Sequence, residues 1–405
     1  MSGRVQVWFV SGCMVLSLAA GELFAAGAKS APIVSRIVVS SSSAPFSGCT
    51  PSALVANVQA VSNDGVVGGY VTSKLGTSPC LPRVFRWNTS GYTIVPYPPM
   101  PPGTNAIGGR IAVISTNNVT GGITFECQGS MSCPSPFEAA TASAPTSQWV
   151  INGWNYVFGI SENGTWITGT NLGGQPLLYN VTTKKPVSLT LNGAAIVNAS
   201  LSSVSNAGLA VGSHDVQQPN TQNGMICITT GPCQEIDKGT TAYRALIKAI
   251  SSNGSYIYGF HAYAQNRNVI TAVTKNGSGG YVVTETSLPY VMFPRADVTD
   301  KGAIVVTTAS GSAYYFVLPG PKTPTQNSYL VYSVAGLISK LGLAGVQQNS
   351  VALSPNGKYL SFNVPVTTGG ASTLIGYSVY FQDGIEAYLM SQLTAVKDAG
   401  GPKKK

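Results

Sequence analysis

The sequence predicts an all-β fold, a β-propeller of about seven four-stranded blades, from two observations. The first is a short motif that recurs at intervals of about 50 residues along the chain. The second is the composition, because only 9% of the 405 residues are charged and small polar residues take their place. Such a composition suits strands and tight turns better than long surface helices, which draw on Glu, Lys and Arg.

The motif is an aliphatic residue, then Ser or Thr, two variable residues and Gly, followed by an alternating apolar run. We expect the hydroxyl to bond the backbone of a turn and the Gly to adopt a positive φ. The alternation that follows is typical of a strand. Six copies align without gaps, at Gly65, Gly164, Gly208, Gly254, Gly302 and Gly357.

A seventh copy fills the double interval between Gly65 and Gly164. The segment from Ile114 to Asn118 fits the motif, with Asn in the place of Gly, and Asn is the next most tolerant residue at positive φ. A repeat of this length with several short strands is typical of propellers, whereas solenoid repeats, the alternative, are usually shorter. The apolar segment 33–40 is expected to add a strand to the last blade and close the ring.

The two ends of the chain differ from the repeats. Residues 1–28 have the pattern of a cleaved secretory signal, with Arg4 before an apolar run and small residues at its end. Lipoprotein anchoring at Cys13 is a minor alternative. We therefore expect a propeller over residues 32–395, a basic flexible tail over 396–405, and no transmembrane segment after signal cleavage.

Six cysteines remain after the signal, and an even number in an exported chain indicates disulfides. Two pairs have five intervening residues that include Gly, which lets the chain bend back far enough for a disulfide. Zinc is the alternative, but no histidine lies near either pair. The expected bonds are Cys127–Cys133, Cys227–Cys233 and, by elimination, Cys49–Cys80.

Two motifs carry a resemblance to known repeat families. The Ile-Ser-x-x-Gly-x-x-Val-Gly pattern, followed by the Val-Phe-Arg-Trp of residues 84–87, resembles the extracellular HAF repeat. The run from Leu353 to Leu360 resembles the PD40 repeat of TolB-type propellers, and residues 384–390 are similar to the last strand of such arrays. Val84 stands near the place of the histidine that gives the HAF family its name. The resemblance implies an exported propeller and no particular activity.

Charge and motifs narrow the functional classes. The net charge is +9, but the basic residues are scattered and no stretch interleaves Arg with aromatic residues, so nucleic acid is an unlikely partner. An anionic surface is a possible partner of the basic tail. The sequence has no calcium loop, nucleophile elbow, zinc-protease helix or phosphate-binding loop. We expect no cofactor and no resident metal.

The candidate ligand-binding residues are few. His214 and His261 each follow a repeat's strand, and a metal pair with Asp215 is the chemically richer alternative to two polar loop histidines. Tyr263 and Trp154 are the aromatic candidates for contacts at a rim. Two further carboxylates, Glu235 and Asp237, are expected in a surface loop. Additional rim candidates are Tyr70 and Tyr290.

The sequence favours an exported, non-catalytic binding or scaffold module for a protein or carbohydrate partner, in the periplasm or cell exterior. One alternative is a propeller hydrolase or lyase with an active site in its channel. Another is a structural component of the cell envelope. The test between them is whether His214, His261, Asp215, Glu162 and Asp297 converge in one cavity.

Overall fold

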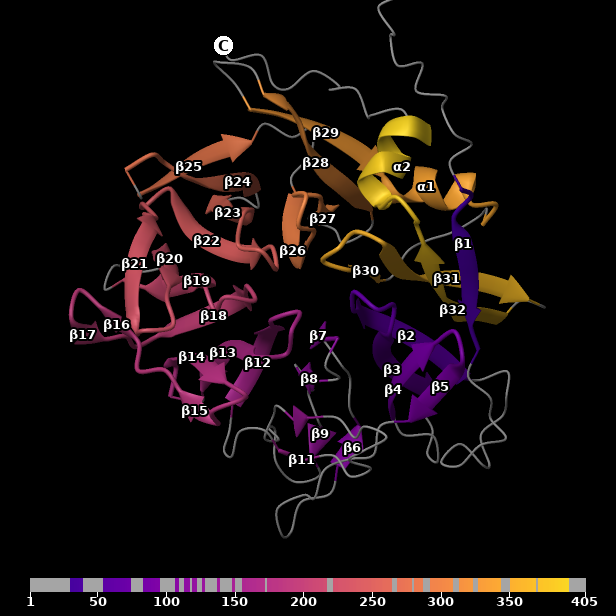
Figure 1. Cartoon of the computed structure of the whole chain (residues 1–405), viewed down its shortest axis with the longest axis horizontal. Coiled ribbons are helices and arrows are strands. Elements are labelled where there is room, and N and C mark those ends of the chain that lie inside the picture. Colours follow the sequence, from indigo (N-terminus) through magenta and orange to yellow (C-terminus); the bar gives the residue numbers. More distant parts are fainter. Residues whose placement is uncertain are drawn as a thin grey trace, which may run out of the picture. The chain divides into compact units, whose positions relative to one another are not determined.

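The computed structural model describes residues 30–38, 54–73, 83–94, 106–108, 113–116, 119–121, 126–127, 137–138, 148–149, 155–171, 173–216, 221–263, 268–278, 280–286, 292–308, 313–322, 327–343, 350–368 and 371–392. The segment Pro32–Lys405 forms one compact unit. Most described residues belong to antiparallel sheets arranged around a common axis, with the first strand of each sheet nearest to it (Figure 1). The β-propeller prediction is therefore confirmed.

Six of the sheets are full blades, each with at least three strands of five residues or more. Blade 1 has β2 (Leu54–Val61), β3 (Val67–Ser73), β4 (Arg83–Asn88) and β5 (Gly91–Ile94). Blade 2 has β12 (Asn155–Ile160), β13 (Trp166–Asn171), β14 (Pro176–Asn180) and β15 (Lys185–Pro186). Blade 3 has β18 (Ala199–Val204), β19 (Ala210–Asp215), β20 (Gln222–Cys227) and β21 (Pro232–Asp237), extended outward by β16 (Thr190–Leu191) and β17 (Ala194–Ala195).

The remaining blades follow the same order from the axis outward. Blade 4 has β22 (Tyr243–Ile250), β23 (Ile257–Tyr263), β24 (Asn268–Lys275) and β25 (Tyr281–Thr286), and blade 5 has β26 (Met292–Val298), β27 (Ile304–Thr308), β28 (Tyr314–Lys322) and β29 (Asn327–Ser333). Blade 6 has β30 (Val351–Leu353), β31 (Tyr359–Thr368), β32 (Ala371–Tyr380) and, outermost, β1 (Ile33–Ile37). Two helices follow strands of the last blades, α1 (Val334–Lys340) and α2 (Ile385–Gln392).

The predicted count of about seven blades is slightly too high. Between blades 1 and 2 lies a short sheet whose strands have two or three residues, and a two-stranded ribbon accompanies it. The sheet contains β7 (Val113–Ile114), β8 (Val119–Gly121), β10 (Phe137–Glu138) and β11 (Gln148–Trp149), and the ribbon pairs β6 (Ala106–Gly108) with β9 (Glu126–Cys127). The hidden repeat at Ile114 thus forms a reduced unit, and Asn118 lies outside the described residues.

The ring closes as the sequence predicts. Strand β1 pairs antiparallel with β32 over five residues, from Ile33 opposite Tyr380 to Ile37 opposite Gly376. Figure 1 shows β1, in indigo, beside the yellow strands of blade 6. Ile37 is buried with Val58 of blade 1, so this strand joins the first and last blades through both hydrogen bonds and packing.

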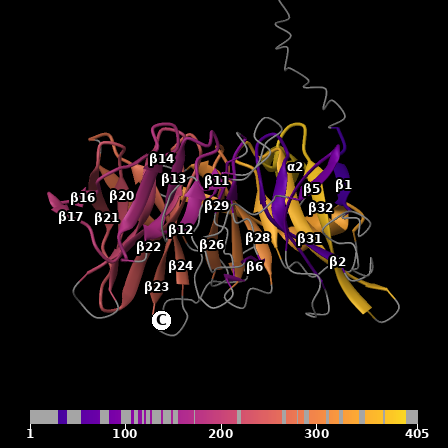
Figure 2. The same ribbon diagram turned by 90° about the horizontal axis from the view of Figure 1, so that it is seen from below.

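The turn motif behaves as predicted. All six marker glycines have φ between +69° and +87°. In the turn after β12, the amide of Gly164 donates to the carbonyl of Ser161 at 2.8 Å, and the hydroxyl of Ser161 accepts from the amide of Trp166 at 2.9 Å. Because each motif turn joins the first and second strands of a blade, the turns share one face of the propeller, and the strands run between the two faces (Figure 2).

The motif turns also bond to one another around the axis. The amide of Asn163 in blade 2 donates to the side chain of Asn206 in blade 3 at 3.0 Å. The side chain of Asn163 donates a second bond, to the backbone carbonyl of Asn206, at 3.3 Å. The same double contact links Asn253 to Asp300 and Asn356 to Asn63, that is, blade 4 to blade 5 and blade 6 to blade 1.

The alternate junctions use a single backbone bond. The amide of Asn206 donates to the carbonyl of Ser252 at 2.8 Å, and that of Asp300 donates to the carbonyl of Pro355 at 2.7 Å. The blades therefore form three doubly bonded pairs, which are joined by simpler contacts. The junction between blades 1 and 2, where the short sheet intervenes, is the exception and involves Glu162.

Helix α1 begins after Ser333, whose hydroxyl accepts a hydrogen bond from the amide of Gly336 at 3.3 Å. The expectation of a final strand over residues 384–390 is wrong, because this segment is helix α2. Its buried Ile385 and Leu389 pack in the cluster of blades 5 and 6. An apolar four-residue spacing, not alternation, governs this segment.

Candidate functional site

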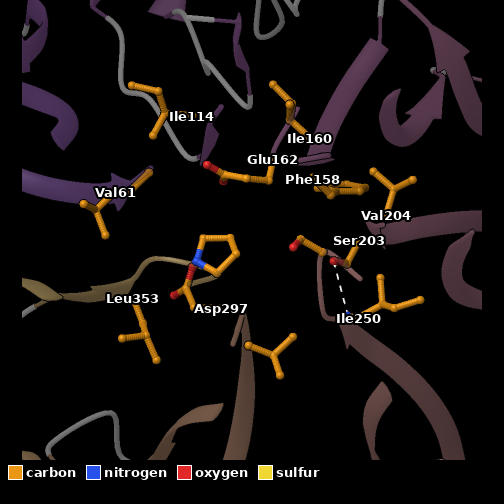
Figure 3. A pocket seen from close by; sticks show the side chains of 15 residues that line it. Val61, Ile114, Phe158, Ile160, Glu162, Ser203, Val204, Ile250, Asp297 and Leu353 are labelled. Carbon is orange, nitrogen blue, oxygen red and sulfur yellow. Dashed lines mark hydrogen bonds between the residues drawn. The ribbon is translucent and has the colours of Figure 1, made fainter. Parts of the chain in front are cut away.

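A cavity of about 80 Å³ lies on the axis of the propeller, among the first strands of the blades. The aliphatic residue that opens every motif copy, including the hidden one, lines it: Val61, Ile114, Ile160, Val204, Ile250, Val298 and Leu353. Figure 3 labels these side chains around the cavity, except Val298, together with Glu162 and Asp297. The motif therefore builds the wall of the cavity, and the space is small compared with ligand pockets of roughly 300–1,000 Å³.

Glu162 has an unusual position in this wall. One oxygen of its carboxyl accepts from the amide of Asn63 at 2.8 Å, and its carbonyl accepts from the amide of Thr116 at 3.0 Å. Its side chain thus reaches from blade 2, past the short sheet, to blade 1 and completes the ring of turns. Burial raises the pKa of Glu162 to about 8, and the nearby charges of Asp64 and Asp300 act in the same direction.

A second group of ionisable residues lies at the other ends of the strands, at the boundary of blades 3 and 4. It contains both histidines and four of the fourteen acidic residues of the chain: His214, His261, Asp215, Glu235, Asp237 and Glu285. We call these six residues the histidine cluster. They lie near the ends of β19, β21, β23 and β25, on the face opposite the motif turns.

His261 is the centre of this cluster. Its Nε2 lies 2.8 Å from Asp237 of blade 3, and its Nδ1 lies 2.8 Å from Glu285 of blade 4. The ring of Tyr243 stacks on it at 4.0 Å between centroids, and the hydroxyl of Tyr263 donates to Glu285 at 2.6 Å. Burial lowers the pKa of His261, but the hydrogen bonds and charges of the two carboxylates outweigh burial and raise the pKa above its usual value.

His214 is bound in a similar way. Its Nε2 lies 2.8 Å from Glu235, and its Nδ1 lies 3.2 Å from the carbonyl of Asp215. Glu235 also accepts from the side chain of Asn223 at 2.9 Å. Burial by itself would raise the pKa of Glu235, but these hydrogen bonds and the charges of His214 and Lys238 lower it.

Both ring nitrogens of both histidines therefore contact an acceptor of the protein. A histidine that acts as a base, or that binds a metal, needs one nitrogen that faces the ligand. Among the described residues, no group of three or more His, Cys, Asp or Glu side chains is placed to hold a metal ion. Each imidazole of the cluster is thus held by protein acceptors at both of its ring nitrogens.

The structure separates the five residues whose convergence in one cavity would have favoured an enzyme. Glu162 and Asp297 line the axial cavity. His214, Asp215 and His261 belong to the histidine cluster on the opposite face. The expectation of a surface loop for Glu235 and Asp237 is wrong, because both lie on β21 and bind the histidines.

Of the predicted aromatic contact residues, two lie within the described part of the chain and two lie outside it. Tyr263 belongs to the surroundings of His261, and Tyr70 is partly buried on β3. Trp154 and Tyr290 lie outside the described residues. Sequence reasoning missed Tyr243 and Glu285, although Tyr243 lies directly opposite Tyr263 in the β22–β23 register. A strand assignment with the correct register would have placed these residues together.

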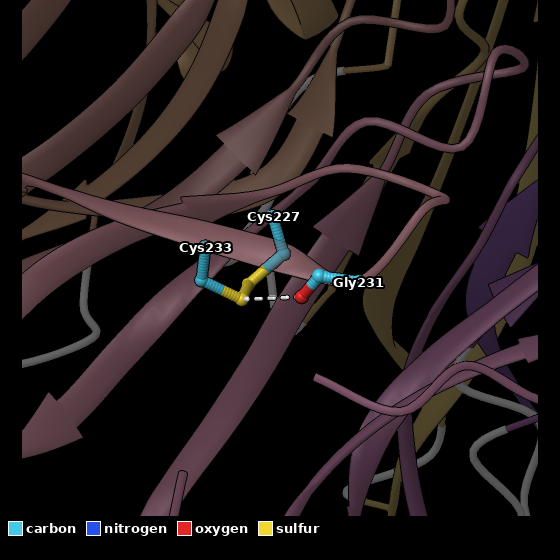
Figure 4. The surroundings of a disulfide bond; sticks show 3 residues. All are labelled: Cys227, Gly231 and Cys233. Carbon is cyan, nitrogen blue, oxygen red and sulfur yellow. Dashed lines mark hydrogen bonds between the residues drawn. A yellow bond between two sulfur atoms is a disulfide. The ribbon is translucent and has the colours of Figure 1, made fainter. Parts of the chain in front are cut away.

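One predicted disulfide is present. Cys227 and Cys233 lie opposite each other in the β20–β21 hairpin, and their sulfurs are bonded at 2.00 Å (Figure 4). The pairs Cys127–Cys133 and Cys49–Cys80 fall outside the residues whose side chains are described. Within the described residues, no helix has the length and apolar character needed to cross a membrane.

Comparisons with known proteins find similar solved structures only at low sequence identity. No protein-family model matches the chain, and no curated protein matches it. Among solved structures, a virginiamycin B lyase from Staphylococcus aureus is 14% identical, with a TM-score of 0.43 over 86% of this chain and 99% of the lyase. An oligogalacturonate lyase in complex with manganese is 8% identical, with a TM-score of 0.43 over 82% of this chain and 91% of that one.

A third neighbour is an Atg21 protein in complex with a coiled coil of Atg16, at 10% identity and a TM-score of 0.44 over 80% of this chain and 99% of that one. Identities and TM-scores this low carry no argument about function. The assignment of this chain as a β-propeller rests on the arrangement of its own sheets.

Proposed function

We propose that this chain is a non-catalytic β-propeller that binds a protein or carbohydrate partner outside the cytoplasm. The observation that carries the proposal is the saturation of His214 and His261, whose four ring nitrogens all contact acceptors within the protein. A site for acid–base chemistry keeps one such group directed at the substrate. The small volume of the axial cavity supports the same conclusion.

The proposed location rests on two features. The apolar N-terminal segment has the pattern of a secretory signal, and the Cys227–Cys233 disulfide is of a kind that persists in oxidising compartments. Determination of the mature N-terminus, together with cell fractionation, tests this part. A relation to the extracellular HAF and PD40 repeats is part of the same proposal and rests on the motif alone.

The alternative is a hydrolase or lyase with two carboxylates on the axis. It is favoured by one observation, namely that Glu162 and Asp297 line the same cavity while burial raises the pKa of Glu162 to about 8. A carboxylic acid that keeps its proton at neutral pH is suited to general acid catalysis.

One experiment separates the two proposals. The purified mature chain is applied to an array of glycans and to immobilised envelope proteins, and each retained ligand is then incubated with the protein and analysed for products. Binding without turnover, unchanged in Glu162→Gln, supports the binding module. Product formation that Glu162→Gln abolishes, while ligand is still retained, overturns it in favour of the enzyme.

A further inference from the structure

The first strands of four blades share a β-bulge two residues before the aliphatic residue of the motif. In β2, β12, β18 and β22 the pairing with the second strand skips one residue at this position. The skipped residues are Gln59, Phe158, Ser202 and Lys248. A bulged residue has no partner in the ladder, and its side chain is redirected.

The four bulged residues differ from their neighbours in exposure. Each is partly or fully exposed, while the residues before and after it are buried. For β22, neighbouring blades cover both faces of the strand through β18 and β26, and β23 covers its outer edge. The side of β22 that faces the propeller axis is therefore the side that these neighbouring strands do not cover. The equivalent residue of blade 2, Phe158, lines the axial cavity and is 42% exposed.

The bulge in blade 4 therefore brings a cation, Lys248, to the axis of the propeller. The same strand carries Arg244 at its exposed end, four residues earlier. Burial lowers the pKa of the Lys248 ammonium, and the charge of Arg244 lowers it further, so the two cations interact with each other. Neither one makes an ion pair or a hydrogen bond through its side chain with any residue in the described part of the chain.

The remaining axial strands do not balance this charge. Strands β2, β12, β18 and β30 contain no charged residue, and β26 contains Arg295 and Asp297. The innermost strands of the six blades thus carry three basic residues and one acidic residue. Removing a cation from water without a counter-charge is unfavourable, and a bound anion would relieve both the desolvation and the repulsion between the two cations.

We propose that the axis of the propeller binds an oxyanion, a phosphate, sulfate or carboxylate group, at Lys248 and Arg244. The site stands on residues that the binding and enzyme proposals above do not use, so it holds or fails independently of them. Lys248 supplies a point charge in a partly enclosed position, and Arg244 supplies a planar set of donors that matches a carboxylate or phosphate.

The test measures the reactivity of Lys248 in the full-length mature protein. A limiting amount of acetic anhydride labels lysines, and mass spectrometry reads the labelling rate at each one, with phosphate, sulfate or succinate compared against chloride at equal ionic strength. We expect at least one of the three oxyanions to slow labelling of Lys248 severalfold. Labelling of Lys275, an exposed lysine on the third strand of the same blade, should not change.

Variants provide the second measurement. The same anion should raise the melting temperature of the wild type and of Lys275→Met, and Lys248→Met should weaken its binding by about tenfold or more, because hydrogen bonds to charged groups are the strong ones. The proposal is overturned if no oxyanion slows the labelling of Lys248, whatever the thermal shifts are. It is also overturned if Lys248→Met binds the anion as well as Lys275→Met does.

Discussion

At the scale of single residues, Glu162 shows how the ring of turns is completed. The short sheet separates blades 1 and 2, so the backbone bond found at the blade 3–4 and blade 5–6 junctions is replaced by a side chain that reaches the amide of Asn63. This contact places a carboxyl group in a buried position, and burial disfavours its charged form. Glu162 therefore carries a proton at neutral pH while its side chain connects the turns of blades 1 and 2.

The first prediction concerns Glu162→Gln. The folded pKa of about 8 exceeds the ordinary value of 4.5, so the native state binds the extra proton. The free energy of unfolding should therefore fall between about pH 4.5 and pH 8, by up to about 1.4 kcal/mol per pH unit from this group, and be flat above. The Gln side chain keeps the acceptor for Asn63 and should abolish this slope in denaturant titrations across that range.

A companion variant checks the hydrogen bond itself. Glu162→Ala removes the acceptor and leaves the Asn63 amide without a partner, which should cost about 1–3 kcal/mol at every pH. Equal stability of the Gln and Ala variants would contradict the structural role given to this side chain.

The second prediction concerns His261. A neutral imidazole has a single N–H, so contacts with both Asp237 and Glu285 are hydrogen bonds only in the charged form. Its pKa is raised in the folded state, so its contribution to stability is complete below the unfolded value near pH 6.5 and is lost as the pH rises through the folded value.

With only two histidines in the chain, proton NMR resolves both rings. We expect the His261 signals to titrate above about pH 6.5, and Glu285→Gln to lower that pKa by removing one carboxylate charge. His214→Gln assigns the remaining signal. A His261 pKa that does not respond to Glu285→Gln would contradict the arrangement.

At the scale of elements, strand β1 joins the two ends of the ring. Its five residues pair with β32, and its two Ile residues lie in opposite environments: Ile37 is 3% exposed within the cluster around Val58, and Ile33 is 61% exposed. The strand thus closes the ring through one buried side chain as well as through its backbone.

The third prediction uses this contrast. Ile37→Ala should lower the free energy of unfolding by about 2–5 kcal/mol, as buried Ile-to-Ala changes do. Ile33→Ala, the same substitution on the same strand, should leave stability within about 0.5 kcal/mol. Deletion of residues 32–41 should lower the melting temperature further, because it also removes the hydrogen bonds to β32. Similar effects of the two Ala variants would show that β1 does not hold the ring.

Elements with a strong local signal could be predicted from the sequence. The turns could be predicted because Ser or Thr and Gly adopt the same backbone geometry in the six copies that end in Gly. The final helix and the place of Glu235 and Asp237 could not be predicted. Both depend on which blade covers a segment, and that is a property of the closed ring rather than of local sequence.

The functional residues were predictable in part for the same reason. His214 and His261 stood out because they are rare, but their partners come from other strands, and register decides which carboxylate reaches which ring. The position of Lys248 could not be predicted from the hydrophobic pattern. Its direction depends on a bulge, and alternation alone does not reveal bulges.

At the scale of the whole molecule, the blades are organised in pairs. The residue two places after the motif Gly is aromatic in blades 2, 4 and 6, and each ring approaches the motif Gly of the following blade: Trp166 on Gly208, Tyr256 on Gly302 and Tyr359 on Gly65. These are the junctions with the double hydrogen bonds. The same three pairs of blades are therefore joined both by an aromatic ring on a motif glycine and by two hydrogen bonds between motif turns.

The fourth prediction compares two glycines with the same backbone strain. Gly65 and Gly254 have φ of +81° and +76°, but a Cβ at Gly65 would lie 2.5 Å from the ring of Tyr359, and one at Gly254 would meet nothing closer than 3.8 Å. Gly65→Ala should therefore destabilise by about 1–3 kcal/mol more than Gly254→Ala, the cost of overpacking. Denaturant unfolding of both variants measures the difference.

A second substitution shows where the extra cost arises. In a Tyr359→Ala background the space beside residue 65 is open, and the two Gly→Ala changes should then cost the same within error. A difference that persists in this background would assign the cost to something other than the contact between the first and last blades.

The pairing has a consequence for how such a chain changes its size. Blades with the aromatic residue alternate with blades that lack it, and each kind makes one type of junction with the next blade. Gain or loss of a single blade would therefore place two blades of the same kind side by side. Gain or loss of two neighbouring blades would preserve the alternation. The unit that is gained or lost in this architecture is then the couplet, which is 90 or 103 residues long by the spacing of Gly164, Gly254 and Gly357. The short sheet is an insertion between two couplets, and the Glu162 side chain spans it to keep the ring of turns connected.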